Sequence, residues 1–365
     1  MKKIKKIGIL TSGGDCAGLN AILRAVVKRA EGGYGWEVYG IEKGTHGLYA
    51  RPPLLRRLRP GMFNGALLRQ AGTILGTTNK GDPFAYPMED GSTSDRSDEL
   101  IEGFQLAGLD ALIGVGGDGS QAILLKLAEK GGIPLVCIPK TIDNDIGATE
   151  VAVGYDTAMQ VATDALDKLQ PTAASHDRVM VLEVMGRDAG HIALNAGIAG
   201  GADVILIPEI SYDLENVATH IRGIYDRGRN FALVVVAEAT PGPASHQVTR
   251  TMEDGQVRYG GVGHWVGQEI AQRTGAEVRV TVLGHIQRGG VPTPRDRLMA
   301  SVFGVRAVDL LAQGKAGHMV AWVNRQVTEL PIRDAIAAFA NVDVAGPLVS
   351  TARGLGICFG DGKEA

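Results

Sequence analysis

A short polar stretch at residues 139–145, PKTIDND, follows directly on an apolar run. Lys140 and Thr141 lead it, and two carboxylates, Asp143 and Asp145, stand two residues apart. A carboxylate can take a proton from a hydroxyl group or help to hold a metal ion, and a lysine attracts phosphate. On an extended backbone both aspartates would share a face, so that one can act as a base while the other holds charge or metal. An Asx-turn that caps the following helix is the alternative, although such a turn needs fewer polar groups.

Two glycine-rich segments, TSGGDCAG and GVGGDGS, also follow apolar runs and precede amphipathic helices. Glycines there expose backbone N–H groups and let a phosphate approach the start of a helix. Neither segment matches the Walker loop or the dinucleotide fingerprint, which argues against both of those classes. In the second segment three glycines surround one carboxylate, which suits Mg²⁺ because that ion takes few carboxylates and shares phosphate oxygens. A tight turn without a ligand and a simple helix cap are the alternatives. The candidate phosphate-binding residues are Gly13, Gly117, Asp118, Gly119 and Ser120, of which Ser120 can also cap the helix.

Arginines, a histidine and a glutamate follow later apolar runs. They are Arg187 in MGRDAG, Glu238 in VVVAEA, and His285 and Arg288 in LGHIQRGG, with Arg279 upstream. Guanidinium groups suit a sugar phosphate because they bind phosphate through two hydrogen bonds, while a carboxylate holds hydroxyl groups. A lone histidine is more often structural, but the position of this one beside an arginine and two glycines favours binding.

Apolar runs alternate with glycine-rich turns and amphipathic helices along the chain. The runs are apolar throughout, which indicates parallel strands buried on both faces, with helices on both sides of the sheet. We expect nine or ten strands, too many for one ordinary open sheet, and therefore an α/β fold of two doubly wound, mostly parallel-sheet, Rossmann-like domains. Ligands of such sheets lie at the carboxyl ends of the strands, where the polar segments should gather. The clearest strands are expected at residues 4–10, 110–115, 134–138, 178–184, 203–207, 231–237 and 277–283, and a helix at 155–169.

Composition excludes several classes of protein. The net charge of -3 over 365 residues is too balanced to indicate a nucleic-acid partner. No apolar run reaches the roughly 18 residues that a membrane span needs. The three cysteines are scattered and odd in number, which fits a reducing cytoplasm. The basic and then apolar start, MKKIKKIGIL, runs into TSGGDCAG rather than a cleavage site, so we interpret it as a first strand.

Together these segments resemble the phosphofructokinase family, from about residue 4 to about residue 309. The motifs TSGGD, GGDGS, TIDND, EVMGR and LGHIQRGG occur in the family's order and spacing. The resemblance implies Mg²⁺-dependent transfer of a phosphoryl group to the 1-hydroxyl of fructose 6-phosphate, a reaction of glycolysis. It also implies a homodimer or homotetramer, because some sugar-phosphate contacts usually come from a neighbouring subunit.

The resemblance assigns roles to individual residues. Asp143 matches the catalytic base, Asp118 the Mg²⁺ residue and Arg187 a transition-state arginine. Thr141 and Asp145 match residues that position the transferring phosphoryl group, the metal and the sugar. The matching sugar-phosphate contacts are Met185, Gly186, Glu238 and Arg288, with further contacts to the 6-phosphate from Arg178, Arg279 and His285.

Two residues give conflicting indications about the phosphoryl donor. Gly119 is typical of ATP-using members, because a small residue leaves room for the α-phosphate, whereas Lys140 looks like the pyrophosphate type. A subgroup of ATP enzymes combines this glycine with this lysine, and we predict ATP, with pyrophosphate as the alternative. Asn79 and Lys80 stand where short bacterial enzymes have an arginine that bridges donor and sugar, and Lys80 can replace that charge.

We predict that residues 1–155 and 275–320 form the donor domain, and that 156–274 and 321–365 form the sugar-phosphate domain. The active site is expected in the cleft between them. An NAD or lipid kinase would account for GGDG but would leave TIDND and LGHIQRGG unexplained. A non-catalytic sugar-phosphate sensor would be expected to have lost the base, whereas Asp143, Asp118 and Arg187 are all present.

Overall fold

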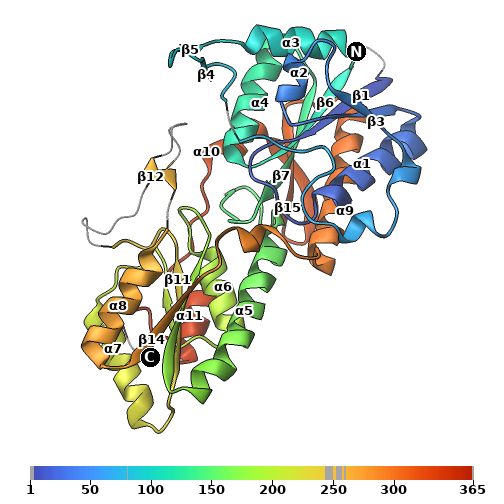
Figure 1. Ribbon diagram of the computed structural model, residues 1–365. Coiled ribbons are helices and arrows are strands. Elements are labelled where there is room, and N and C mark those ends of the chain that lie inside the picture. Colours follow the sequence, from blue (N-terminus) through green and yellow to red (C-terminus); the bar gives the residue numbers. More distant parts are fainter. Residues whose placement is uncertain (1–3, 80, 243–249, 252–256, 259, 364–365) are drawn as a thin grey trace. The chain divides into compact units, whose positions relative to one another are not determined.

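Figure 1 shows a computed structural model of the chain, which describes residues 4–79, 81–242, 250–251, 257–258 and 260–363. The chain divides into two compact units, and each has its own sheet. The first unit comprises Met1–Thr157 and Arg288–Phe339, and the second comprises Ala158–Gln287 and Ala340–Ala365. Parallel pairings predominate in both sheets, so the prediction of an α/β fold with two mostly parallel sheets is confirmed.

The sheet of the first unit has the strand order β16-β15-β7-β6-β1-β2-β3, with the short β8 paired to the end of β7. Its centre is parallel, and the edge strands β3 and β16 run antiparallel to their neighbours. Every residue of β6 and β7 is buried, as expected for strands that helices cover on both faces. The strands are β1 (Lys6–Thr11), β2 (Glu37–Ile41), β3 (Leu55–Leu58), β6 (Ala111–Gly116), β7 (Leu135–Thr141), β8 (Val153–Gly154), β15 (His318–Val323) and β16 (Gln326–Pro331).

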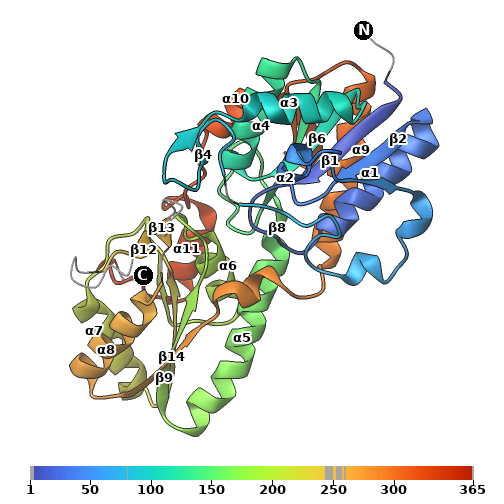
Figure 2. The same cartoon turned by 45° about the horizontal axis from the view of Figure 1, so that its top comes forward.

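Helices cover both faces of this sheet (Figures 1 and 2). On one face α1 (Leu19–Tyr34) packs against α9 (Pro294–Ala312) so closely that a Cβ on Gly304 would lie 2.7 Å from the Cβ of Ala25. On the other face, side chains of the strands and helices form an apolar core. The helices on that face are α3 (Ser97–Leu106), α4 (Asp118–Gly131) and α10 (Ile332–Ala337). Shorter elements of this unit are α2 (His46–Tyr49), η1 (Pro60–Met62), η2 (Leu67–Arg69), β4 (Tyr86–Pro87) and β5 (Thr93–Ser94).

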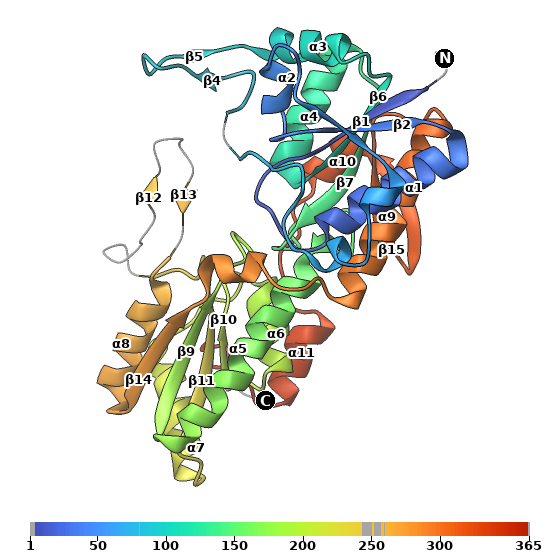
Figure 3. The same ribbon diagram turned by 45° about the vertical axis from the view of Figure 1, so that its right-hand side comes forward.

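The sheet of the second unit is parallel throughout, with the order β10-β11-β9-β14. Its strands are β9 (Arg178–Val184), β10 (Val204–Leu206), β11 (Ala232–Ala237) and β14 (Glu277–Val282). Figures 1 and 3 show helices on both faces of this sheet. On one face α7 (Leu214–Asp226) and α8 (Val262–Thr274) pack on the strand valines, and on the other lie α5 (Tyr155–Ser175), α6 (His191–Ala199) and α11 (Pro347–Gly354). The remaining elements are β12 (Arg250–Thr251), β13 (Val257–Arg258) and η3 (Gly284–Arg288). No helix among the described residues is long and apolar enough to cross a membrane.

The units differ from the predicted domains in where the chain passes between them. The prediction placed residues 275–320 in the first domain, but β14 pairs with β9 in the second sheet. It placed residues 321–365 in the second domain, but β15 lies beside β7 in the first sheet and β16 forms a hairpin with it. The passages instead fall near residues 288 and 339. An apolar run identifies a strand, whereas the sheet that the strand joins depends on partners far away in the sequence.

Candidate active site

Three polar segments gather at one edge of the first sheet. The strands β1, β6 and β7 are parallel neighbours, so the segments that follow them lie at the same edge. The turn after β1 is tied to the end of β6 by a hydrogen bond from the Ser12 N–H to the Val115 carbonyl at 2.9 Å. The prediction that TSGGD, GGDGS and TIDND gather at the carboxyl ends of the strands is therefore correct for this unit.

The chain bends after β7 rather than continuing as an extended strand. The Asp143 N–H donates to Thr141 Oγ1 at 3.0 Å, and Thr141 Oγ1 donates to Asp143 Oδ2 at 3.3 Å. Asn144 has a left-handed φ of 54°, which asparagine tolerates better than most residues, and its Oδ1 accepts the Ala152 N–H at 3.2 Å. The expectation of an extended stretch with both carboxylates on one face is wrong, because Asp145 is only 4% exposed while Asp143 is half-buried. The bend fixes the Asp143 carboxylate against a hydroxyl group at the end of β7.

Lys140 is buried at the end of β7, with 5% of its surface exposed. Its Nζ donates to the Gly14 carbonyl at 2.6 Å. A Cβ on Gly13 would lie 3.3 Å from that Nζ and 3.2 Å from Ser120 Oγ. Burial is the main factor that lowers the pKa of Lys140, and the positive charge of Arg288 lowers it further. An ammonium and a hydroxyl group thus border the bare face of Gly13, where a phosphate can approach the backbone.

The helix α4 starts at the GGDGS motif. Gly117 is its N-cap and Asp118 its first residue, so Ser120 lies inside the first turn, and the alternative in which Ser120 caps the helix is not borne out. The first N–H groups of a helix lack partners within the helix, which makes this terminus a donor site for an anion. Gly119 is exposed, and among the described residues no atom beyond its chain neighbours and the backbone of its own helix lies within 4 Å of where a Cβ would stand. The backbone at the start of α4 is therefore open.

Arg288 lies in the first unit, against the turn that follows β1. Its Nη1 donates to the Asp15 carbonyl at 3.1 Å, and a Cβ on Gly14 would collide with its guanidinium group. The sequence assigned Arg288 to the sugar-phosphate contacts, whereas the structure brings it together with the glycine-rich turn after β1 in the first unit. Asn79, assigned to the donor, is exposed in the segment beside that turn. Lys80 lies outside the described residues.

A loop with Arg187, residues 185–190, follows β9 in the second unit. Glu238 comes directly after β11, and its Oε1 accepts the N–H groups of Gly186 at 3.3 Å and of Arg187 at 3.0 Å. Arg187 has a left-handed φ of 52°, and its side chain is exposed. Because β9 and β11 are parallel neighbours, the structure brings together four predicted residues, Met185, Gly186, Arg187 and Glu238.

Arg178 and Arg279 lie toward the other end of the same sheet. Arg178 is the first of the seven residues of β9, so about 20 Å of strand separates it from the arginine loop. Both arginines contact Glu277, with Arg178 Nη2 at 2.9 Å from Glu277 Oε1. The bond from Arg178 is the main cause that holds the pKa of Glu277 below its usual value. Within the second unit the structure does not bring these two arginines to Arg187, whereas the exposed His285 follows β14 at the carboxyl edge.

Metal ligands are sparse. Within the parts of the chain that the structure describes, no three histidine, cysteine, aspartate or glutamate side chains form a cluster that could hold a metal. Mg²⁺ is commonly bound by one or two carboxylates together with waters and substrate phosphates. The single carboxylate of Asp118, at a helix start that suits an anion, fits that mode of binding.

Two carboxylates that shape the second unit were missed from the sequence. Glu183 in β9 is 2% exposed and accepts the N–H groups of Gly261 at 3.1 Å and Gly263 at 2.8 Å at the start of α8. A charge inside the apolar run RVMVLEV is the signal that identifies it. Glu209 follows β10 and accepts the Gly190 N–H, but a single acid after a short strand carries no such signal.

Phosphate-binding turns and a buried lysine at the strand ends of a parallel sheet are typical of α/β enzymes that transfer phosphoryl groups. The family description Phosphofructokinase matches residues 6–311 of the chain. The chain belongs to the phosphofructokinase family.

Individual relatives agree with this assignment. An ATP-dependent 6-phosphofructokinase 1 from Synechocystis is 60% identical over 361 residues, which cover 99% of this chain and 100% of that protein. A protein of the same name from Nostoc is 59% identical over the same shares. The crystal structure of Pichia pastoris phosphofructokinase in the T-state superposes with a TM-score of 0.77 at 29% identity. It covers 92% of this chain, which in turn spans 36% of that longer chain.

Proposed function

We infer that the chain is an ATP-dependent 6-phosphofructokinase, a glycolytic phosphotransferase that transfers a phosphoryl group from ATP to the 1-hydroxyl of fructose 6-phosphate. The observation that carries this inference is the end of β7. There a buried lysine contacts the turn after β1, and Asp143 is fixed against Thr141. The full-length identity of 60% to an ATP-dependent 6-phosphofructokinase supports the same activity and donor.

In the first unit, Asp143 accepts the proton of the sugar hydroxyl as the new O–P bond forms. Thr141 orients Asp143, and the buried Asp145 adds negative charge at the end of the same loop. Lys140, Ser120 and the bare face of Gly13 hold the phosphates of the donor. We propose that Asp118 contacts Mg²⁺, which supplies positive charge to the phosphate oxygens during transfer.

In the second unit, Arg187 stabilises the charge on the transferring group, and Glu238 orients the Arg187 backbone while its carboxylate also faces sugar hydroxyls. Met185 and Gly186 line the sugar in this proposal. Positioning and charge neutralisation are what phosphoryl transfer requires of a protein, and these groups supply both.

Gly119 supports ATP as the donor. A carboxylate at this position would repel the α-phosphate of ATP, whereas pyrophosphate has no α-phosphate beyond its leaving group. Among the described residues, no side chain lies within 4 Å of a Cβ at Gly119, so a small side chain there would meet the donor before it met the protein. Lys140 can serve the transferring phosphoryl group of either donor.

Arg178 and Arg279 support self-association. Both lie toward the amino ends of their strands, at the far end of the sheet from Arg187. We propose that they contact the 6-phosphate in a neighbouring subunit of a homodimer or homotetramer. A cytoplasmic location stays a prediction, which the free cysteines Cys16, Cys137 and Cys358 fit.

The direct test is steady-state phosphorylation of fructose 6-phosphate with Mg²⁺, with ATP and pyrophosphate compared in parallel. We expect turnover with ATP. Turnover with pyrophosphate alone would overturn the assignment of the donor. An Asp143→Asn variant should still bind both substrates in calorimetry while kcat falls by about 10²–10⁴-fold, the usual contribution of a general base. A variant that binds and still turns over would remove Asp143 from the role of base.

A further inference from the structure

The segment that follows the last passage of the chain, residues 340–343, docks at the start of α6. His191 Nε2 lies 2.9 Å from the Ala340 carbonyl oxygen. Two residues further on, the Val342 N–H donates to Glu209 Oε1 at 2.9 Å, and the Val342 side chain is 6% exposed. Two polar contacts and one buried side chain therefore hold this segment in the second unit.

Glu209 also binds the loop that contains Arg187. The Gly190 N–H lies 3.0 Å from Glu209 Oε1 and 3.2 Å from Oε2. Gly190 is both the last residue of the arginine loop and the N-cap of α6. A Cβ on Gly190 would lie 2.8 Å from Glu209 Oε2, so the approach is close. One carboxylate therefore joins the end of the arginine loop to the C-terminal segment.

The arginine loop is thus held at both ends by carboxylates from neighbouring strands. Glu238 after β11 binds its first part, and Glu209 after β10 binds its last residue. Between them the Ala189 N–H donates to the Gly186 carbonyl at 3.1 Å. A left-handed φ at Arg187 persists in a non-glycine residue only when its surroundings impose it. These contacts supply that constraint.

The hydrogen bonds that Glu209 accepts from the Gly190 and Val342 N–H groups should be stronger than bonds between neutral groups. A carboxylate that accepts backbone N–H groups forms charge-assisted hydrogen bonds, and its charge is favourable at the start of a helix. The Gly190 backbone is buried, so removal of the carboxylate leaves its N–H without a partner. Relaxation of the loop then shifts the backbone that carries the Arg187 side chain.

We propose that Glu209 and the C-terminal segment, residues 340–343, position Arg187 for phosphoryl transfer. Glu209 acts as a positioning residue that touches neither substrate. This proposal rests on the proposed function, in which Arg187 stabilises the transition state. It gives a role to a part of the chain beyond residue 311, the end of the family match.

The test is a double-mutant cycle between Glu209 and Arg187. We expect Glu209→Ala to lower kcat by tenfold or more with the KM for ATP unchanged, because a displacement of about 1 Å costs on the order of 10²-fold. Glu209→Gln keeps an oxygen for both N–H groups and should restore most of the activity. In an Arg187→Ala background the same Glu209→Ala change should have little further effect, since the two residues act through one interaction.

Equal losses from Glu209→Ala in both backgrounds would overturn the proposal, because a purely structural role predicts independent effects. If the wild-type chain does not phosphorylate fructose 6-phosphate at all, the proposed function itself fails, which is a separate outcome. Val342→Pro is a second variant, which removes the N–H that contacts Glu209 and also replaces the buried side chain that holds the segment. It should lower kcat in the same direction with Arg187 intact. An unchanged kcat in Val342→Pro would remove the C-terminal segment from the proposal. Val344→Pro, at an exposed position two residues further on, is its control.

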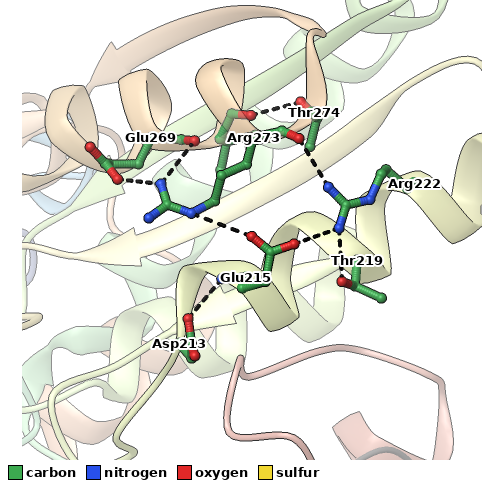
Figure 4. Close-up of polar contacts among 8 residues, drawn as sticks. Asp213, Glu215, Thr219, Arg222, Glu269, Arg273 and Thr274 are labelled. Atoms are coloured by element: carbon green, nitrogen blue, oxygen red, sulfur yellow. Dashed lines mark hydrogen bonds and ion pairs between the residues drawn. The ribbon is translucent and has the colours of Figure 1, made fainter.

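A matched control for the glutamate lies elsewhere in the second unit. Figure 4 shows Glu215 between Arg222 and Arg273 on α7 and α8. Its Oε1 accepts from Arg222 Nη2 at 2.6 Å, in a surface network that does not include the arginine loop. Glu215→Ala should therefore leave kcat unchanged. A fall in kcat equal to that of Glu209→Ala would mean that any loss of a glutamate contact in this unit lowers activity.

Discussion

Lys140 Nζ lies 2.6 Å from the carbonyl oxygen of Gly14. This contact joins β7 to the turn after β1, although β6 separates these two strands in the sheet. It explains why a lysine leads the polar stretch PKTIDND. The side chain reaches from β7 to the glycine-rich turn after β1 and brings a positive charge to the backbone of that turn.

The lowered pKa of Lys140 predicts that kcat/KM for ATP declines on the alkaline side of its pH profile at a lower pH than an ordinary lysine would cause. We call this decline the alkaline limb. Burial and the Arg288 charge favour the neutral amine, so Lys140 loses its proton at a lower pH than an ordinary lysine does. In the proposed function the charged form of Lys140 binds the phosphates of the donor, so kcat/KM for ATP should fall as the pH rises through this lowered pKa. Arg288→Gln removes the like charge and should move the limb to higher pH. Lys140→Arg should abolish it, since a guanidinium stays charged. A limb at the same pH in all three proteins would exclude Lys140 as its source.

Gly119→Asp should damage the use of ATP far more than the use of pyrophosphate. In the described part of the chain, no atom beyond the chain neighbours and the backbone of α4 lies within 4 Å of the new Cβ, so we expect the variant to fold with an unchanged Tm. The cost of placing a carboxylate beside a phosphate is several kcal/mol, which lowers kcat/KM for ATP by roughly two orders of magnitude or more. Gly119→Ala controls for the loss of the glycine and should retain most of the activity. ATP kinetics in Gly119→Asp equal to those of the wild type would refute the steric and electrostatic argument.

Asp296 should contribute far more to stability than its position at the start of a surface helix implies. It is fully buried, its Oδ1 accepts the Gly154 N–H at 2.9 Å, and its Oδ2 accepts the Thr157 N–H at 2.8 Å. Asp296→Ala leaves these buried donors unpaired and should lower the free energy of unfolding by about 3 kcal/mol. Asp309 lies on the same helix α9 and forms a partly exposed ion pair with Arg29 of α1, so Asp309→Ala should lower the free energy of unfolding far less than Asp296→Ala does. Urea denaturation of both variants checks the difference, and similar midpoints would contradict it.

Hybrid oligomers can test whether Arg178 serves a neighbouring subunit. Arg178→Ala should raise the KM for fructose 6-phosphate and leave the KM for ATP unchanged. Subunits with Arg178→Ala and subunits with Asp143→Asn should each be impaired alone. Co-expressed, they should regain activity, because a hybrid site combines an intact Asp143 from one chain with an intact Arg178 from the other. No gain in activity from a hybrid that purifies as a mixed oligomer would show that both residues act within one chain.

The strands and the phosphate-binding segments could be predicted because their signals are local. The strands β6 and β11 consist wholly of buried residues, so their sequences lack alternation, and the glycines that follow β1 and β6 mark turns directly. The residues Asp118, Lys140 and Arg187 stand beside such signals. Each was found where a buried strand gives way to polar groups.

The remaining features depend on partners that are distant in the sequence. Whether β14 joins the first or the second sheet is decided by its pairing with β9, and nothing in its own six residues specifies that choice. In the sequence, Asn144 is not distinguished from the other polar residues of PKTIDND. In the structure, its left-handed backbone and its hydrogen bond from the Ala152 N–H bend the loop. Glu209 acquires its role only because Gly190 and Val342, far apart along the chain, meet beside it.

The late return of the chain to its first sheet also has a consequence for biosynthesis. On the ribosome, β7 is made long before β15, and residues 142–317 are translated between them. Until β15 emerges, the part of β7 before Lys140 remains an open edge of the nascent first sheet, because β8 pairs only with Lys140 and Thr141. The pairing of β7 is thus completed only after β15 has been translated. A message that stops before residue 318 should yield a chain that binds chaperones or aggregates rather than a partly active enzyme.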